Sequence, residues 1–302
     1  MGGARRVSLA DRAVTMSDTE AFRATEAAIA LPAADRGALA ANAWRRLEPT
    51  VLGAGTIAIV LIVWQLLPHL VTISAGTKLF FTTPSQVLDT LWTMFATGTI
   101  WQPLGVSAAG FALGLAIAIV VGLPLGVLLG RSRTLNAMLD PFITAFNATP
   151  RLVFLPLLVL WFGLGLWSKV VIVFIGALFP IVINTYEGVR NADRILIDVV
   201  RSFGAKEWDI ARLVVVPNAL PYIVAGLRLA IGRAVIGVVV AEFFGSTEGL
   251  GVIMIQAASS YHVDVVFAGL IVFAALSLAM TGLLQFLENR LSEWRPRQGA
   301  DA

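Results

Sequence analysis

Ionisable side chains interrupt several long apolar stretches of this sequence, a placement that is costly in a membrane and usually marks a function. These side chains are Arg151, Glu187, Arg228, Arg233 and Glu242. Such residues support two kinds of chemistry, binding of a polar solute and transfer of ions across a membrane. We expect Arg151, beside Asn147 on a proline-bent stretch, to offer an anion a positive, hydrogen-bonding site, and Glu242 to lie on the same solute path.

Structural explanations stand beside this hypothesis. Arg151 would equally serve the fold if it formed an ion pair with an acidic neighbour. Glu187 and Arg228 stand near the ends of apolar stretches, where a long side chain reaches the aqueous phase. The sequence leaves both readings open.

The sequence carries no recognisable set of residues for catalysis or metal binding. Cys is absent, and His69 and His262 are the only imidazoles, so a Cys-based or His-rich metal centre is not expected. Neither a Ser-His-Asp spacing nor a His-Glu-x-x-His motif occurs, and no G-x-x-x-x-G-K-[ST] loop is present to bind ATP. We therefore expect a chain that binds no cofactor and is not itself an enzyme.

Composition indicates an integral membrane protein. Of the 302 residues, 58% are hydrophobic and 14% charged, whereas soluble domains average roughly 45–50% and about 25%. A helix needs about 20 apolar residues to cross a bilayer. Six stretches satisfy this requirement: residues 51–70, 104–130, 138–162, 167–187, 219–244 and 265–287. The predicted fold is all-α, a polytopic membrane protein with about six transmembrane helices.

Basic residues gather in alternate connections between these stretches, which predicts the orientation of the chain. One side holds Arg45, Arg46, Arg131, Arg133, Arg190, Arg194, Arg201, Lys206, Arg212, Arg290, Arg295 and Arg297, and the other little beyond Lys78 and Lys169. Because the number of spans is even, both termini are expected in the cytoplasm. Membrane lipid, and not nucleic acid, is then the partner that explains the net charge of +3.

The two ends of the chain differ from its apolar middle. Residues 1–43 are rich in Ala, Arg, Asp, Glu and Thr and lack the apolar core of a signal peptide. We expect them to form a disordered cytoplasmic tail with no cleaved leader. Residues 44–290 form the predicted transmembrane domain, and residues 291–302 a short cytoplasmic tail.

Small residues recur at every fourth position along the second apolar stretch. They are Gly110, Gly114, Ala118, Gly122, Gly126 and Gly130. This spacing predicts a groove in which another membrane helix packs closely. Prolines within the spans, at positions 124, 150, 156 and 180, predict kinks or freed carbonyl groups.

A short helix is expected on the outer surface before that stretch. Thr83, Pro84 and Gln86 have the pattern of a helix N-terminus with a capping box. The apolar residues that follow at helical spacing are Val87, Leu88, Leu91, Trp92 and Phe95. We interpret this helix as part of the scaffold.

A charged segment, residues 192–217, lies between the fourth and fifth apolar stretches. Ile195, Leu196, Val199, Val200 and Phe203 fall on one face at helical spacing, and Arg194, Asp198 and Arg201 on the other. Gly204 then interrupts the helix, a second short helix is expected from about Lys206 to Leu213, and Pro217 and Pro221 frame the next span. The pattern fits either a helix on the inner leaflet, anchored by Trp208, or a projection bound by a soluble partner.

The stretch "DVVRSFGAKEWDIARLVVVPNALP", residues 198–221, resembles the cytoplasmic signature of binding-protein-dependent ABC importer permeases. That signature runs Glu-Ala-Ala, three residues, Gly, nine residues, Ile, one residue, Leu-Pro. With this spacing kept, Asp198, Val199 and Val200 stand first, Gly204 at the glycine, and Val214, Val216 and Pro217 at the end. Other stretches between about 83 and 290, such as "GLPLGVLLGRS" and "FPIVINTYEGVRN", resemble the subfamily that imports nitrate, sulfonates, taurine and related solutes.

The resemblance implies a type I importer transmembrane domain that acts as the permease subunit. It implies that a coupling helix docks on an ATPase through Asp198, Arg201, Ser202, Phe203, Gly204, Ala205 and Trp208. It also implies two copies of an ATPase subunit that uses ATP and Mg, an extracytoplasmic solute-binding protein, a second permease copy in a homodimer, and a bacterial cytoplasmic (inner) membrane as the location.

A secondary transporter driven by an ion gradient is the alternative function, because the ionisable residues within the spans would suit an ion relay. Such transporters often consist of inverted repeats. No inverted repeat is evident between the halves of this sequence, which favours the ATP-driven importer.

Overall fold

The computed structural model describes residues 36–70 and 80–291, and the regular elements in these ranges are all helical. The chain divides into two compact units, Met1–Leu67 and Pro68–Ala302. Helix α2, Arg36–Leu70, accounts for the described part of the first unit, and its window Val51–Pro68 is apolar enough to cross a membrane. The predicted tails lie largely outside the described residues, although α2 includes residues 36–43 of the first.

The second unit contains the remaining helices. In chain order they are α4 (Pro84–Ala96), α5 (Trp101–Arg131), α6 (Arg133–Ala148), η1 (Arg151–Phe154), α7 (Leu155–Phe162), α8 (Leu166–Arg190), α9 (Arg194–Ser202), α10 (Glu207–Ile210), η2 (Ala211–Val215), α11 (Val216–Gly245), α12 (Leu250–Ser259) and α13 (Val263–Leu291). Four of its helical stretches are long and apolar enough to span: Trp101–Arg131, Leu166–Arg190, Glu207–Gly245 and Val263–Arg290. The all-α membrane fold and five of the six predicted spans are confirmed.

The third predicted span, residues 138–162, is not one helix. Arg133–Ala148 and Leu152–Phe162 are apolar and long enough only as a pair, and the two are bent by 87°. The break contains Pro150, which has no N–H, and Thr149 before it has the extended conformation that a following proline favours. Helices α5 and α8, in contrast, continue through Pro124 and Pro180.

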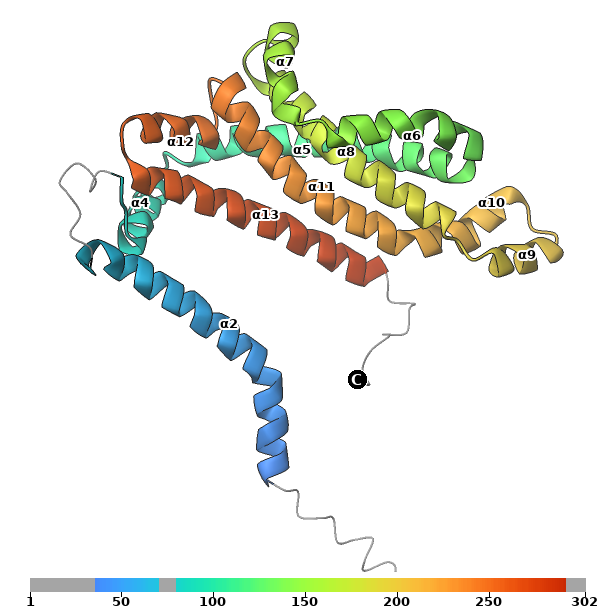
Figure 1. Cartoon of the computed structure of the whole chain (residues 1–302), viewed down its shortest axis with the longest axis horizontal. Helices are drawn as coiled ribbons and strands as arrows, with labels where there is room; N and C mark the ends of the chain where they lie inside the picture. The colour runs from blue at the N-terminus through green and yellow to red at the C-terminus, as the bar shows by residue number, and fades with distance from the viewer. Residues whose placement is uncertain (1–35, 71–79, 292–302) are drawn as a thin grey trace, which may run out of the picture. The chain divides into compact units, whose positions relative to one another are not determined.

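The centre of the second unit is formed by α5, α8 and α11, with α8 packed against both of the others (Figure 1). The glycines of α5 face α8 at very short range. A Cβ atom on Gly114 would lie 2.6 Å from Val173 Cβ, and one on Gly126 would lie 2.6 Å from Thr185 Cβ. The groove predicted from the small residues is therefore confirmed, and α8 is the helix that occupies it.

Helix α4 matches the predicted short surface helix. The Gln86 side chain accepts the Thr83 N–H at 3.0 Å, in the predicted capping box. Val87 and Leu91 are buried, and α4 packs on α13, where the Thr90 hydroxyl donates to Asp264. Only part of the predicted apolar stripe is thus used in packing.

Candidate functional site

The segment 192–217 begins with α9, which ends in a left-handed turn at Gly204, where φ is +82°. The Gly204 N–H donates to the Arg201 carbonyl at 2.9 Å, and the Ala205 N–H donates to the Val200 carbonyl at 3.4 Å. These two bonds form a Schellman motif with glycine at its left-handed position. Glycine is required there because residues with a Cβ rarely adopt this conformation.

The second half of the segment is continuous with a membrane span. Helix α10 passes through the π-helical turn η2 into α11, so that Glu207–Gly245 is one helix of 39 residues. The Asp209 carboxylate accepts the Lys206 N–H at 3.0 Å and caps its beginning. The prediction of a separate short helix that ends near Leu213 is therefore wrong. The π-helical turn Ala211–Val215 joins α10 to α11, and Pro217 stands in the first turn of α11, just after this turn.

Large apolar side chains project from both halves of this segment. Ile195 is 73% exposed, Phe203 86% and Trp208 73%. They lie together with charged side chains in the segment 192–217. Exposed apolar groups of this size, gathered on one short projection, are typical of a surface that binds another molecule.

Val200 does not share this exposed face. Val200 and Ile197, which are three residues apart on one side of α9, both pack against a buried cluster. Val200 therefore does not lie with the other four residues predicted to share its face, because α9 has one apolar side that packs inward and another that is exposed.

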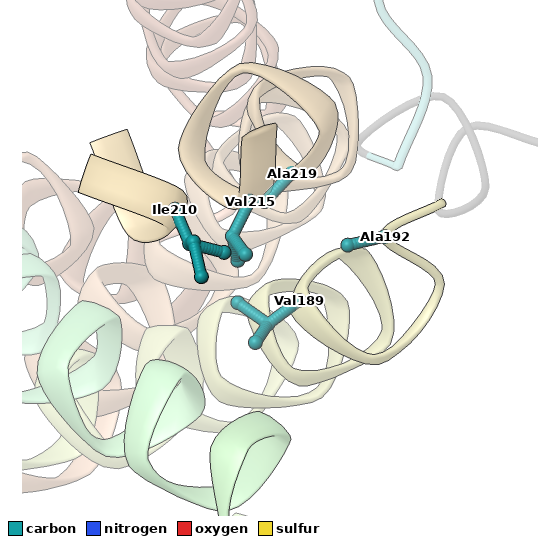
Figure 2. Close-up of a cluster of buried hydrophobic side chains, with 5 residues drawn as sticks. All are labelled: Val189, Ala192, Ile210, Val215 and Ala219. Atoms are coloured by element: carbon teal, nitrogen blue, oxygen red, sulfur yellow. The ribbon is translucent and has the colours of Figure 1, made fainter. Parts of the chain in front are cut away.

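The buried cluster joins the segment to the ends of the spans (Figure 2). It consists of Val189 and Ala192 at and after the end of α8, Ile210 on α10, Val215 on η2 and Ala219 on α11. In the figure, Ile210 and Val215 come from one helix and point toward Val189 of the other. The cluster fixes the base of the segment, so the exposed side chains are held on a rigid support.

Charged side chains also connect the two halves of the segment. Arg201 lies 3.6 Å from Asp198 and 3.1 Å from Glu207, and Glu207 lies 3.6 Å from Arg131 at the end of α5. The side chains are largely exposed, so each pair is worth at most about 1 kcal/mol. The Ser202 hydroxyl donates to the Val199 carbonyl at 2.7 Å. All seven residues predicted for docking therefore lie on or beside one turn.

The predicted solute-path residues occupy separate places. Asn147, at the end of α6, accepts a hydrogen bond from Arg233 on α11 at 2.7 Å and lines a cavity of about 320 Å³ with Thr149 and Ile236. The side chain of Arg151 lies outside what the structure describes. The partner of Asn147 is thus Arg233, a charged residue within an apolar stretch for which the sequence alone predicts no partner.

Glu242 lies elsewhere, about 14 Å further along α11 at 1.5 Å per residue. It is 1% exposed, and its carboxylate accepts the Ser107 hydroxyl at 2.7 Å and the Gly251 N–H at 2.8 Å. It also pairs with Lys169, which is fully buried in α8. The assignment of Lys169 to an outer connection is wrong, and the one signal for its burial was its position in the first turn of an apolar stretch.

Within residues 36–70 and 80–291, no group of three or more His, Asp or Glu side chains is arranged to hold a metal ion. The geometry instead offers a rigid projection with exposed aromatic groups and a cavity beside an arginine–asparagine pair.

Comparison with known proteins links these features to a family. Residues 119–293 match the model of the binding-protein-dependent transport system inner membrane component. The chain is 34% identical to the taurine transport system permease protein TauC of Escherichia coli (strain K12), over 83% of this chain and 92% of that protein. It is 33% identical to a Bacillus subtilis (strain 168) protein provisionally named aliphatic sulfonates transport permease protein SsuC. That match covers 89% of this chain and 97% of the SsuC protein.

Solved structures show the same fold. An inward-facing form of the MetNI methionine ABC transporter matches with a TM-score of 0.53 and 24% identity, over 63% of this chain and 93% of that one. An amino acid ABC transporter matches with a TM-score of 0.52 and 19% identity, over 70% of this chain and 100% of that one. The predicted type I importer transmembrane fold is thereby confirmed.

Proposed function

The chain belongs to the family of binding-protein-dependent transport system inner membrane components, and on this premise we propose that it imports a small solute by alternating access driven by a separate ATPase. The permease itself would bind neither ATP nor Mg. The observation that carries the proposal is the projection around Gly204, where Phe203 and Trp208 are exposed on a rigidly held turn.

The coupling step follows from this geometry. An ATPase groove that buries Phe203 and Trp208 gains apolar contact, and the exposed Arg201 and Asp198 supply charges at its rim. Because α10 is continuous with α11, movement of the docked turn is transmitted directly to a membrane span. We propose two ATPase copies, one docked on each permease of a homodimer, and delivery of the solute by an extracytoplasmic binding protein.

The orientation is part of the proposal. The excess of Lys and Arg at the ends of α5, α8 and α13 and in segment 192–217 favours the cytoplasm for this side of the protein. Both tails, residues 1–43 and 291–302, would then lie in the cytoplasm and residues 44–290 in a bacterial inner membrane.

The proposed solute is a small sulfonate such as taurine, or a related anion such as nitrate. The names of the two similar permeases support this class. In this chain, Arg233 places a positive charge beside Asn147 at the cavity between α6, α8 and α11, and Arg151 on the next turn would add a second. Glu242, enclosed by its partners, we assign instead to holding the helix ends together.

Reconstitution tests this function. The tagged chain is purified with the proteins that accompany it and placed in vesicles together with its binding protein. We expect uptake of a labelled sulfonate that requires ATP on the side of Gly204 and is unaffected by collapse of ion gradients. Uptake that follows an imposed proton or sodium gradient, with no ATPase recovered, would show the alternative, a secondary transporter.

A further inference from the structure

A second cavity lies at the basic end of the second unit, apart from the cavity beside Asn147. Its volume is about 500 Å³, and its walls come from the end of α5, the start of α6, the end of α8 and the start of α9. The polar side chains that line it are Arg131, Arg133, Asn136, Tyr186, Arg190 and Arg194. Four guanidinium groups thus surround one hollow, and no carboxylate lines it.

Two of these arginines are held in place by neighbours. The Arg190 guanidinium donates to the Tyr186 hydroxyl and lies 5.7 Å from the centre of its ring. Arg131 lies 3.6 Å from the Glu207 carboxylate and donates to the Glu207 carbonyl at 3.4 Å. The two positions are therefore set in advance, which lowers the entropic cost of binding a ligand.

The other two arginines, Arg133 and Arg194, form no ion pair or side-chain hydrogen bond with any residue in the described ranges. Each is the first residue of its helix, where a positive charge is unfavourable next to the helix dipole. The nearest carboxylate in sequence, Asp193, accepts the Ile195 N–H and is not part of the lining. The cavity therefore has an uncompensated positive charge.

The cavity lies at the level where a membrane span ends. Arg131 and Arg190 are the last residues of two spanning helices, so the hollow lies next to the headgroup layer of one leaflet. Basic pockets between membrane helices at this level are suited to acidic lipid headgroups. Arginine pairs with phosphate oxygens through two parallel hydrogen bonds, and Asn136 and Tyr186 add polar groups for the rest of a headgroup.

We propose that this cavity binds the phosphate of an anionic phospholipid, with Arg133 and Arg194 as its main contacts and Arg131 and Arg190 as the fixed wall. The site is independent of the solute path. A bound lipid would connect α6 to the base of α9, so it would also stabilise the start of the segment 192–217.

Native mass spectrometry of the full-length chain, with any co-purified subunits, tests the proposal. Delipidated protein is titrated with phosphatidylglycerol and with phosphatidylcholine of the same acyl chains. We expect phosphatidylglycerol to bind more tightly, and the double variant Arg133→Gln, Arg194→Gln to lose about 25-fold in its affinity, about fivefold for each arginine. Arg194→Lys, which keeps the charge, should lose less than Arg194→Gln.

The matched control removes two positive charges elsewhere in the segment 192–217. Lys206 and Arg212 are exposed and do not line the cavity, so Lys206→Gln, Arg212→Gln should bind phosphatidylglycerol as the wild type does. Equal loss in both double variants would overturn the proposal, because binding would then depend on net charge alone. So would equal affinity for the two lipids.

Competition with inorganic phosphate identifies the source of the ligand. If the site takes lipid, excess phosphate should leave phosphatidylglycerol bound, because the acyl chains add membrane contact that free phosphate lacks. If phosphate displaced the lipid from the wild type but not from the Arg133→Gln, Arg194→Gln variant, the proposal of a lipid ligand would be overturned. The cavity would then be a site for the free anion.

Discussion

Lys169 on α8 and Glu242 on α11 form an ion pair in which neither side chain is exposed to solvent. The Lys169 ammonium also donates to the Glu248 carbonyl at 3.3 Å, and the Ser107 hydroxyl that donates to Glu242 accepts the Leu250 N–H at 2.9 Å. The pair is therefore the centre of a network that joins α5, α8, α11 and α12. A buried pair of this kind is tolerated only when its remaining hydrogen-bonding groups are also satisfied.

Removal of one partner should be costly. Lys169→Met leaves an unpaired carboxylate in the interior, and we expect a loss of about 3–5 kcal/mol in the free energy of unfolding, measured as thermal unfolding in detergent. The double variant Lys169→Met, Glu242→Gln should recover part of this loss. The exposed pair Arg228–Glu288, at 3.3 Å, is the control, and Arg228→Met should cost less than about 1 kcal/mol. Similar losses at both pairs would contradict the role of burial.

A negative side chain at the turn should separate docking from folding. In Gly204→Asp the new Cβ has no neighbour within 4 Å, so the only cost in the isolated chain is the left-handed conformation, about 1–2 kcal/mol or less for Asp. We expect normal insertion but loss of the ATPase in a pull-down and loss of transport. Gly98→Asp is the matched control, because Gly98 also follows the end of a helix, has φ +76°, and its new Cβ would meet only the Trp101 side chain at an ordinary 3.8 Å. Normal uptake by Gly204→Asp would refute docking at this turn.

The Arg233–Asn147 pair should affect transport more than assembly. Arg233→Ala removes a charge-assisted hydrogen bond at the cavity, and we expect solute uptake to fall by roughly tenfold or more, with the ATPase still bound. Arg228→Ala on the same helix, whose side chain pairs with Glu288, should leave uptake nearly unchanged. Arg151→Ala tests separately whether Arg151 contributes to the solute path. Unchanged uptake with correct insertion would show that it does not.

Substitution of two glycines on α5 should have different effects on stability, because only one of them lies in the groove that α8 fills. A Cβ on Gly114 would lie 2.6 Å from Val173, whereas a Cβ on Gly105 has no neighbour within 4 Å. We expect Gly114→Ala to lower the unfolding temperature because α5 and α8 must separate. Gly105→Ala should be neutral or stabilise by up to about 1 kcal/mol, through helix propensity alone. Equal unfolding temperatures for the two variants would show that the close packing is unimportant.

Periodic features of the sequence predicted the structure well where they concern one helix. The repeat of small residues predicted a groove on α5, and the Thr83–Gln86 pattern predicted the start of α4. Neither pattern names the partner helix, because a glycine indicates where space is left and not which side chain fills it. That α8 fills the groove became clear only from Val173 and Thr185 in the structure.

Pairings between distant residues could not be predicted in the same way. Lys169 and Glu242 are far apart in the chain, and Arg233 and Asn147 also lie on different helices. Their distances depend on the packing of α6, α8 and α11, for which composition and spacing give no register. Similarly, Pro150 indicated a kink, but the 87° bend depends on the neighbours of α6 and α7.

The helix Glu207–Gly245 begins beside the turn at Gly204 and reaches the opposite end of the span. At 1.5 Å per residue its 39 residues measure about 58 Å. Its last carbonyl, at Gly245, accepts the Gly165 N–H at 3.2 Å and the Ser168 hydroxyl at 3.3 Å. A rod of this length works as a lever, because one degree of tilt about its Glu207 end displaces Gly245 by about 1 Å. A tilt of a few degrees at the Glu207 end is therefore enough to break these distal hydrogen bonds without any intermediate relay.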